Sequence, residues 1–488
     1  MEKYNIVFIM TDTQNQSMVG AYGNQKVDTP NLDLLAQNGF RFDQAYTTCP
    51  LCTPARSAIF TGIHPQVNGA WANNIAPAKN IAYMGDIFRQ IGYRAAYTGK
   101  WHLDGSGYFG DGCAEGGFEF EWWYDGQRYA EDLGEIRFSL YKKAKTPYDL
   151  ETGGFTEEWI WGHRVTNHAI DFLEKVGSQP FLLVVSYDEP HSPYVAPREY
   201  WVKFSPDDIP GSPAYNAPLT GKPFIQQLQR SERHKDTPWS DFNRTLTRFF
   251  GCNSFIDREI GRVIQAVEQL HPDNTVIIYT SDHGDMMGAH GLVQKGPMMY
   301  QPIVNIPLII KMPGSTKNNI VHSPVSHIDL LPTMLELAGE ESPSILQGTS
   351  LLPILTQQSD QVRDNAYISF HRFAINHDDW GGFFPIRCIT NGKYKLAINL
   401  FDLDEFYDLE NDPYELNNQI NNANLAEIRN ELHISLLAEM DRIRDPFRGY
   451  QWHERPWHTI GNRFYFGGAR RNAPTGFIFQ PKGLEAGE

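Results

Sequence analysis

The chain has 488 residues, of which 41% are hydrophobic and 20% are charged, a composition typical of a folded globular protein. This length predicts one large domain and a smaller one, because single hydrophobic cores seldom grow to such a size. The formal net charge is −16, so the chain has no excess of cations with which to bind nucleic acid. No segment approaches the roughly 20 apolar residues of a membrane helix, and we expect no membrane partner.

The N-terminal sequence MEKYNIVFIMTD runs directly into a strand-like apolar segment, without the successive regions of a secretory signal. We therefore expect a cytoplasmic protein, or a periplasmic or secreted one if an export signal was trimmed. The five cysteines, at positions 49, 52, 113, 252 and 388, are too few and too scattered for a disulfide scaffold.

Four apolar, β-branched segments that end in polar residues predict buried strands of a mostly parallel sheet. They are NIVFIMTD (5–12), RAAYTGKWH (94–102), PFLLVVSYDEPH (180–191) and TVIIYTSDHGD (275–285). Helical patterns lie between them, for example over 31–40 and 253–270. This alternation predicts a doubly wound α/β fold, in which a ligand site lies beyond the carboxyl ends of the strands.

The pattern changes after about residue 360. Short segments that resemble antiparallel strands follow, with a turn expected at Asn391-Gly392, and then a helix over 425–445. The final segment is aromatic and basic and is expected to wrap over the surface. We therefore predict a large α/β domain over 1–362 and a C-terminal α+β subdomain over 363–488, which carries a short antiparallel sheet, a helix and the aromatic tail.

The segment YTTCPLCTPARSAIFTG (46–62) holds two of the cysteines. Cys49 and Cys52 form a C-x-x-C pair, which could be a redox dithiol or half of a zinc site. No second C-x-x-C or histidine pair follows at ligand spacing, so neither function is favoured. The sequence that begins at Cys52, CTPARSAIFTG, resembles the C-x-P-x-R…T-G signature of the type I sulfatases.

The resemblance extends over nearly the whole chain. The segments that carry it, in the order expected of the family, are NIVFIMTDTQ, TPNLDLLAQNGFRFDQAY, GKWHL, SYDEPHSPY, YTSDHGDMMGAHGLVQKG, HIDLLPTML and EFYDLENDPYELNN. It implies an alkaline-phosphatase-like fold and a nucleophile made by oxidising Cys52 to formylglycine, with Cys49 as a bystander. The maturation partner implied is a formylglycine-generating enzyme or an anaerobic sulfatase-maturating enzyme.

The resemblance also implies roles for five further residues. Arg56, which falls one turn after the nucleophile if a helix begins there, would hold the formylglycine hydrate. Lys100 and Lys295 would bind sulfate oxygens. His102 would be the base that collapses the sulfated intermediate, and the spacing places it on one face with Lys100 if the strand continues. His191 would contact the ester oxygen and protonate the leaving group.

A divalent cation is implied as well, expected to be Ca²⁺, with Mg²⁺ or Mn²⁺ as alternatives. The candidate ligands are two carboxylates, one imidazole and the converted nucleophile: Asp12, Asp282, His283 and Cys52. Most relatives carry a second aspartate after the first, whereas this chain has Thr13 and Gln14. Either of these two side chains could fill the gap through a neutral oxygen.

A substrate rim is a further hypothesis. Charged groups stand among aromatic residues and glycines in SFHRFAINHDDWGGFFPIR (369–387), which suits sugar binding, although a contact between domains is the alternative. Asn73 and Asn74 could reach the substrate or cap a helix. The rim candidates are Asn74, His371, Arg372, His377 and Arg387.

These features predict a sulfuric ester hydrolase that acts on a sulfated carbohydrate. The Asp-His pair at 282–283 also resembles phosphonate monoester hydrolases and choline sulfatases, so a phosphonate monoester or phosphodiester hydrolase is the alternative within the fold. A non-catalytic binding or redox protein with unmodified Cys52 is the alternative from another class.

Overall fold

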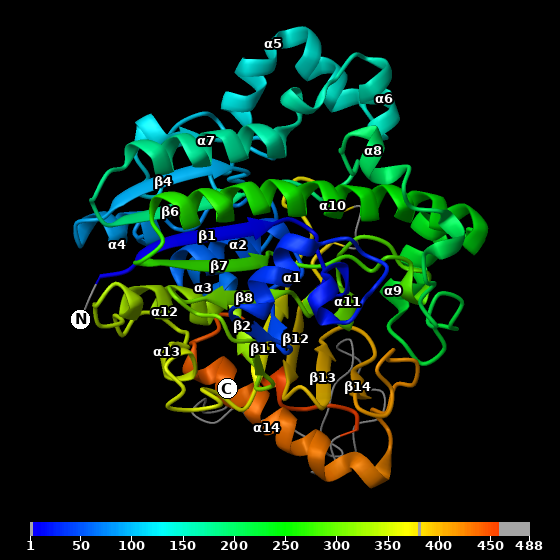
Figure 1. The fold of residues 1–488 in the computed structure, drawn as a ribbon. Coiled ribbons are helices and arrows are strands. Elements are labelled where there is room, and N and C mark those ends of the chain that lie inside the picture. Colours follow the sequence, from blue (N-terminus) through cyan, green and yellow to red (C-terminus); the bar gives the residue numbers. More distant parts are fainter. Residues whose placement is uncertain (1–2, 379–381, 458–488) are drawn as a thin grey trace, which may run out of the picture.

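The computed structural model describes residues 3–378 and 382–457, and an eight-stranded sheet forms its centre (Figure 1). The spatial order is β5-β4-β6-β1-β7-β8-β2-β9. The strands are β1 (Asn5–Thr11), β2 (Phe40–Phe42), β4 (Arg94–Gly99), β5 (Trp123–Tyr124), β6 (Phe181–Ser186), β7 (Thr275–Ser281), β8 (Leu308–Lys311) and β9 (Asn319–Val321). Only β8 runs antiparallel to its neighbours, so the predicted mostly parallel sheet is confirmed.

Helices cover both faces of this sheet, as a doubly wound fold requires. One face packs against α2 (Cys52–Thr61), α4 (Met84–Gln90) and α12 (Leu330–Leu337). The other packs against α1 (Pro30–Gln37), α7 (Trp161–Lys175) and α10 (Trp239–Leu270). Side chains of β1 alternate between the two layers: Phe8 belongs to the first and Ile9 to the second, and both are fully buried. This double cover explains the continuous apolar character of the central strands.

The remaining secondary structure lies in the connections. These elements are β3 (Ala45–Tyr46), α3 (Pro65–Asn68), α5 (Gly126–Lys143), α6 (Pro147–Thr152), α8 (Arg198–Trp201), α9 (Phe224–Gln229), α11 (Gln301–Val304), β10 (Val325–Ser326) and α13 (Leu352–Leu355). None of the helices within the described ranges combines the length and the apolar character that crossing a bilayer requires.

The carboxyl ends of four central strands are aligned. Met10 of β1 pairs with Ser186 of β6, Thr11 with Ser281 of β7, and Gly99 of β4 with Ser186. The residues that follow these strands therefore emerge side by side at one edge of the sheet, where the fold places its ligand site.

The four central strands end before the polar residues that close the predicted segments, and the end of β4 matters for two site residues. β4 stops at Gly99, whose φ is +112°, and a Cβ there would lie 1.8 Å from the carbonyl oxygen of Ser186. Lys100 and His102 lie in the following loop, and His102 has a φ of +58°. The expectation that these two side chains share one face of a strand is therefore wrong, because a glycine at a close backbone approach turns the chain out of the sheet.

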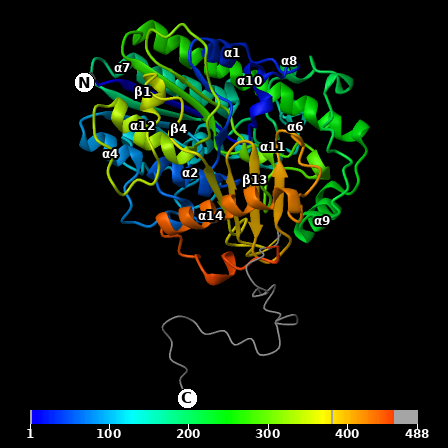
Figure 2. The same ribbon diagram turned by 90° about the horizontal axis from the view of Figure 1, so that it is seen from below.

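A second, four-stranded antiparallel sheet follows in the chain, in the order β11-β12-β13-β14. Its strands are β11 (Ala366–Phe370), β12 (Ile386–Thr390), β13 (Tyr394–Asn399) and β14 (Glu405–Asp408). The predicted turn at Asn391-Gly392 joins β12 to β13. Helix α14 (Ala426–Arg442) packs on one face, and residues of β3, of the loop before α2 and of α11 pack on the other (Figure 2). From residue 458 onward, the predicted aromatic tail lies outside the described residues.

Candidate active site

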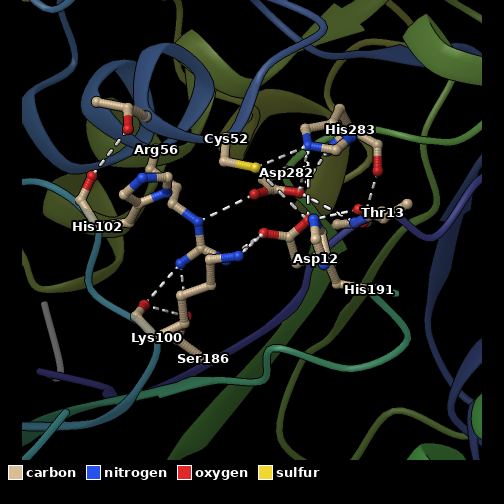
Figure 3. A network of polar contacts seen from close by, with 12 residues as sticks. Asp12, Thr13, Cys52, Arg56, Lys100, His102, Ser186, His191, Asp282 and His283 are labelled. Carbon is tan, nitrogen blue, oxygen red and sulfur yellow. Dashed lines mark hydrogen bonds and ion pairs between the residues drawn. The ribbon is translucent and has the colours of Figure 1, made fainter. Parts of the chain in front are cut away.

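The sulfur of Cys52 lies at the start of helix α2, beside the carboxyl ends of β1 and β7 (Figure 3). It is 2.8 Å from Lys295 Nζ, 3.2 Å from His283 Nε2 and 3.7 Å from Asp12 Oδ1. Only 2% of the residue is exposed. Three residues from distant parts of the chain thus converge on one buried atom of a fourth.

The surroundings of this sulfur favour negative charge. Burial and the Asp12 carboxylate both act to raise the pKa of the Cys52 thiol. Lys295, Lys100 and His283 outweigh them and lower the pKa to about 6. An anionic oxygen at the same position would meet the same favourable field.

Helix α2 is capped by a distant loop. Asn73 Oδ1 accepts a hydrogen bond from the backbone N–H of Thr53 at 3.1 Å, which satisfies one of the free donors at the helix start. Asn73 also donates its own N–H to Phe373 O at 3.0 Å and forms an isolated β-bridge with Ala374. Capping, the alternative given for Asn73, is therefore confirmed.

Three buried cations surround two buried carboxylates in the site. Arg56 Nε lies 3.0 Å from Asp282 Oδ2, and its NH2 group lies 3.6 Å from Asp12 Oδ2. Lys100 Nζ and Lys295 Nζ lie 2.7 Å and 3.7 Å from Asp12 carboxylate oxygens. The helix start places Arg56 one turn after Cys52 as predicted, but its hydrogen bonds go to Asp282, to the carbonyl oxygen of Lys100 and to Ser186 Oγ rather than to the sulfur.

Four side chains could hold a metal ion. Donor atoms of Asp12, Cys52, Asp282 and His283 all lie within 4.8 Å of one another. His283 Nδ1 donates to Gly284 O at 2.8 Å, which leaves the Nε2 lone pair directed to the other donors. Burial and the nearby Asp12 carboxylate raise the pKa of Asp282 to about 6, a repulsion that a cation between the two would relieve. The donor set therefore fits a divalent cation.

Only one of the two candidates for the missing carboxylate is near this cluster. Gln14 binds Asn253 Oδ1 through Nε2 at 2.8 Å and accepts a hydrogen bond from the Tyr279 hydroxyl, so its side chain is occupied elsewhere. Thr13 Oγ1 lies 2.5 Å from Asp12 Oδ1. Thr13 has a φ of +75°, which is unfavourable for a β-branched residue and is found mainly where function requires it.

His102 is built to remain neutral. Burial, Lys100 and Arg56 lower its pKa to about 3. Its Nε2 lies 3.0 Å from Asn74 Oδ1, and with that oxygen as acceptor the ring proton is on Nε2. The buried Nδ1 has no hydrogen-bond partner among the described residues and is free to accept a proton. Asn74, predicted as a rim residue, thus holds the tautomer of His102.

His191 follows β6 and is half-buried. Burial, Lys295 and Lys100 lower its pKa to about 4. Two neighbours were missed in the sequence: Asp188, which accepts from Lys100 Nζ at 2.9 Å, and Tyr108, which contacts both Asp188 and His191. The position of Asp188 at the end of a predicted strand could have identified it, whereas Tyr108 lies in a glycine-rich loop without any such signal.

Comparison with known proteins assigns this arrangement to a family. The sequence model described as "Sulfatase" matches residues 4–340, more than two thirds of the chain. The chain belongs to the sulfatase family. It is a type I sulfatase of the alkaline-phosphatase-like superfamily and therefore an enzyme, as its motifs predicted. A second description, "N-sulphoglucosamine sulphohydrolase, C-terminal", matches residues 288–442.

The sulfatase has relatives along its full length. The uncharacterized sulfatase YidJ of Escherichia coli K12 is 43% identical over 483 residues, 98% of this chain and 95% of the relative. A solved structure in complex with its substrate D-glucosamine-2-N,6-O-disulfate has a TM-score of 0.74 at 23% identity and covers 92% of this chain and 99% of its own. The structure of the phosphonate monoester hydrolase of Agrobacterium radiobacter has a TM-score of 0.76 at 22% identity and covers 90% of this chain and 96% of its own. These two structures support the fold.

Two of the rim candidates of the sulfatase are buried and cannot line an open rim. Arg387 is fully buried and binds both oxygens of Asp445, at 2.7 and 3.0 Å. His371 is also fully buried, and its ring packs against Trp71 and Phe447. The rim prediction is wrong for both residues, because each is enclosed where the small sheet meets its neighbours.

The other candidates of that segment remain predictions. Arg372 is partly exposed and pairs with Asp378, and the ring centroid of His377 lies 5.8 Å from that of Phe373.

The C-x-x-C pair forms no disulfide. Cys49 is fully buried, and both Cys49 and Cys52 are free thiols. Burial raises the pKa of Cys49, which argues against a reactive dithiol at this position.

Proposed function

We propose that this sulfatase removes sulfate from a sulfated carbohydrate, with formylglycine formed from Cys52 as the nucleophile and a divalent cation beside it. Ca²⁺ is the first choice because two of the ligands are carboxylates, and Mn²⁺ or Mg²⁺ is the alternative. The observation that carries the proposal is the convergence of Lys295, His283 and Asp12 on the sulfur of Cys52.

The chemistry needs more than a nucleophile, because the sulfate ester is itself negative. Hydrated formylglycine would supply an attacking hydroxyl and a second hydroxyl through which sulfate is released, and the cation would neutralise sulfate oxygens. Lys100 and Lys295, both almost fully buried, supply two further positive charges. His102 offers an Nδ1 that has no hydrogen-bond partner among the described residues and can take a proton, and the half-buried His191 would protonate the leaving group.

A carbohydrate is the substrate class that the relatives support best. The solved neighbour that holds D-glucosamine-2-N,6-O-disulfate shares the fold over 92% of this chain. The C-terminal match to the N-sulphoglucosamine sulphohydrolase description points in the same direction. The sugar and the position of the sulfate group are for the experiment to identify.

The test is sulfate release by protein produced together with a formylglycine-generating or anaerobic sulfatase-maturating enzyme. Peptide mass spectrometry should find the Cys52 peptide about 18 Da lighter than the thiol form. The matured protein should hydrolyse 4-nitrophenyl sulfate and release sulfate from members of a set of defined sulfated saccharides. Cys52→Ala, carried through the same procedure, is the matched control. Converted protein that releases sulfate from none of these compounds would contradict the proposal.

A phosphonate monoester or phosphodiester hydrolase is the second candidate. The observation in its favour is the position of His283, next to Asp282 and 3.2 Å from the Cys52 sulfur. The phosphonate monoester hydrolase fold matches over 90% of this chain. Rates on 4-nitrophenyl sulfate and on bis(4-nitrophenyl) phosphate separate the two. A strong preference for the diester would replace the first proposal by the second.

A further inference from the structure

Tyr108 lies against side chains of the candidate active site. It belongs to the glycine-rich loop after β4 and is half-buried. Its ring centroid lies 3.7 Å from Lys100 Nζ, a cation–π contact, and 5.6 Å and 5.5 Å from the ring centroids of His102 and His191. The aromatic ring therefore touches three side chains that the proposed reaction uses.

The hydroxyl of Tyr108 joins His191 to a carboxylate. It donates to Asp188 Oδ1 through a short hydrogen bond and lies 3.1 Å from His191 Nδ1. The same Asp188 oxygen accepts from Lys100 Nζ at 2.9 Å. Because the hydroxyl proton is engaged by Asp188, the oxygen lone pairs of Tyr108 face the imidazole.

The contacts of His191 define which of its nitrogens is available. Nδ1 lies 2.8 Å from the carbonyl oxygen of Ser192, which can only accept, so Nδ1 carries a proton. Within residues 3–378 and 382–457, no hydrogen bond to Nε2 is present, and this nitrogen is left for a substrate. A ring that also donates from Nε2 carries a full positive charge. That charge would face Ser192 O and Tyr108 Oη, with the Asp188 carboxylate directly behind.

We propose that Tyr108 is a positioning residue that, together with Asp188, holds His191 as the acid for the leaving group. The inference rests on the proposed sulfate ester hydrolysis. As the bond between sulfur and the ester oxygen breaks, its electron pair goes to that oxygen, which takes the proton from His191 Nε2. His191 is left neutral with its proton on Nδ1. Tyr108 transfers no proton, since its O–H remains donated to Asp188.

The contact between Tyr108 and His191 matters because the charge around His191 changes when a sulfate group binds. Lys100 and Lys295 both act against a positive charge on His191. They are also the cations that a bound sulfate group would neutralise. The hydrogen bond to Tyr108 adds an orienting contact that depends on neither lysine, so the ring keeps its direction while sulfate binds and leaves.

The decisive variant is Tyr108→Phe, which keeps the ring and its contact with Lys100 and removes only the hydroxyl. Phenyl sulfate needs protonation of its departing oxygen much more than 4-nitrophenyl sulfate does, because 4-nitrophenolate is a stable anion. We expect kcat on phenyl sulfate to fall by about tenfold or more, and kcat on 4-nitrophenyl sulfate by less than about threefold. Ser106→Ala, in the same loop with its side chain donating to the neighbouring Asp104, is the control and should change neither rate.

A double-mutant cycle tests whether the effect passes through His191. In a His191→Asn background, adding Tyr108→Phe should lower kcat on phenyl sulfate by less than about twofold, because the two residues act as one unit. Equal losses on both substrates, or additive losses in the double variant, would overturn the inference and assign Tyr108 to general structure or substrate binding. Wild-type protein with formylglycine that releases sulfate from neither the aryl sulfates nor the sulfated saccharides would overturn the proposed function itself, and this inference with it.

Discussion

Arg56 and Arg387 are both fully buried against carboxylates, yet their surroundings differ. Arg387 meets one carboxylate with two hydrogen bonds, to Asp445 at 2.7 and 3.0 Å, so the pair is neutral and geometrically complete. Arg56 is shared between two carboxylates: its Nε binds Asp282, but its NH2 group lies 3.6 Å from Asp12 and makes no hydrogen bond within the described residues.

The difference between these two regions separates a site from a structural contact. Around Arg56, the two lysines Lys100 and Lys295 bring the cations to three, and they share three carboxylates, Asp12, Asp282 and Asp188, all nearly or fully buried. The charges balance in number, but the Arg56 NH2 group and Asp12 Oδ2 have no hydrogen-bond partner among the described residues, and proteins keep such incompletely paired buried charges where a ligand completes the contacts. Completeness of pairing, rather than the presence of an arginine, is the informative property.

The largest effect is expected where the pairing is complete. Arg387→Ala leaves the Asp445 carboxylate buried without its partner, and it should lower the free energy of unfolding by about 3–5 kcal/mol. The kcat of the protein that remains folded should change little. Chemical denaturation and kinetics on the same preparation measure both quantities. A loss of kcat with unchanged stability would restore Arg387 to the substrate rim.

Lys295→Ala should lower the activity and leave the stability nearly unchanged. Lys295 Nζ lies 2.8 Å from the nucleophile position, so its removal should lower kcat/KM by about 10²–10³-fold. Arg56 and Lys100 keep their ion pairs with Asp12, Asp282 and Asp188, and we expect the unfolding midpoint to shift only slightly. Matched formylglycine content, checked by mass spectrometry, is the necessary control. A large drop in stability at unchanged kcat/KM would contradict the proposed role.

A buried histidine extends the comparison to an uncharged group. Burial lowers the pKa of His64 to about 4, so the folded state keeps it neutral while the unfolded chain takes up a proton below about pH 6.5. The contribution of neutral His64 to the free energy of unfolding is therefore fully present above pH 6.5. It is lost as the pH drops toward 4, by up to about 3 kcal/mol. His64→Gln should reduce the slope of the free energy of unfolding against pH in this window by the amount that the uptake of one proton contributes. An unchanged slope would show that His64 does not contribute.

The smallest effect concerns the residue beside Asp12. Thr13→Asp adds a carboxylate at the cluster and should tighten Ca²⁺ binding by about tenfold, measured by calorimetry or as a larger calcium-dependent rise in the unfolding midpoint. Thr13→Asn is the control, since Asn tolerates the left-handed backbone as well as Asp does but adds no charge. Equal calcium responses of the two variants would remove Thr13 from the cation site.

The sequence brought together the two carboxylates of the cluster around Cys52 because both follow strands. Asp12 and Asp282 come directly after apolar segments, and the parallel register of β1 and β7 brings them together. Family motifs added Cys52 and Lys295, which the structure joins at 2.8 Å. The four central strands and the turn at residues 391–392 were predicted from the same local patterns.

Other features depend on contacts that no local pattern reveals. Whether Arg387 faces solvent or Asp445 is decided 58 residues further along the chain. The early end of β4 follows from the close approach of Gly99 to a carbonyl oxygen on β6. The proposed role of Tyr108 depends on the folding of its loop back over Lys100, which the local sequence does not reveal.

The link from Thr53 through Asn73 to Phe373 has a practical consequence for protein engineering. An exchange of the C-terminal part between relatives would replace the strand-end loop on which the cap of α2 is fixed. Hybrid enzymes should therefore retain activity only when the segments around residues 71–74 and 371–375 are transplanted as a pair. The segment that caps α2 and the C-terminal segment that holds it should therefore be treated as one unit in such exchanges.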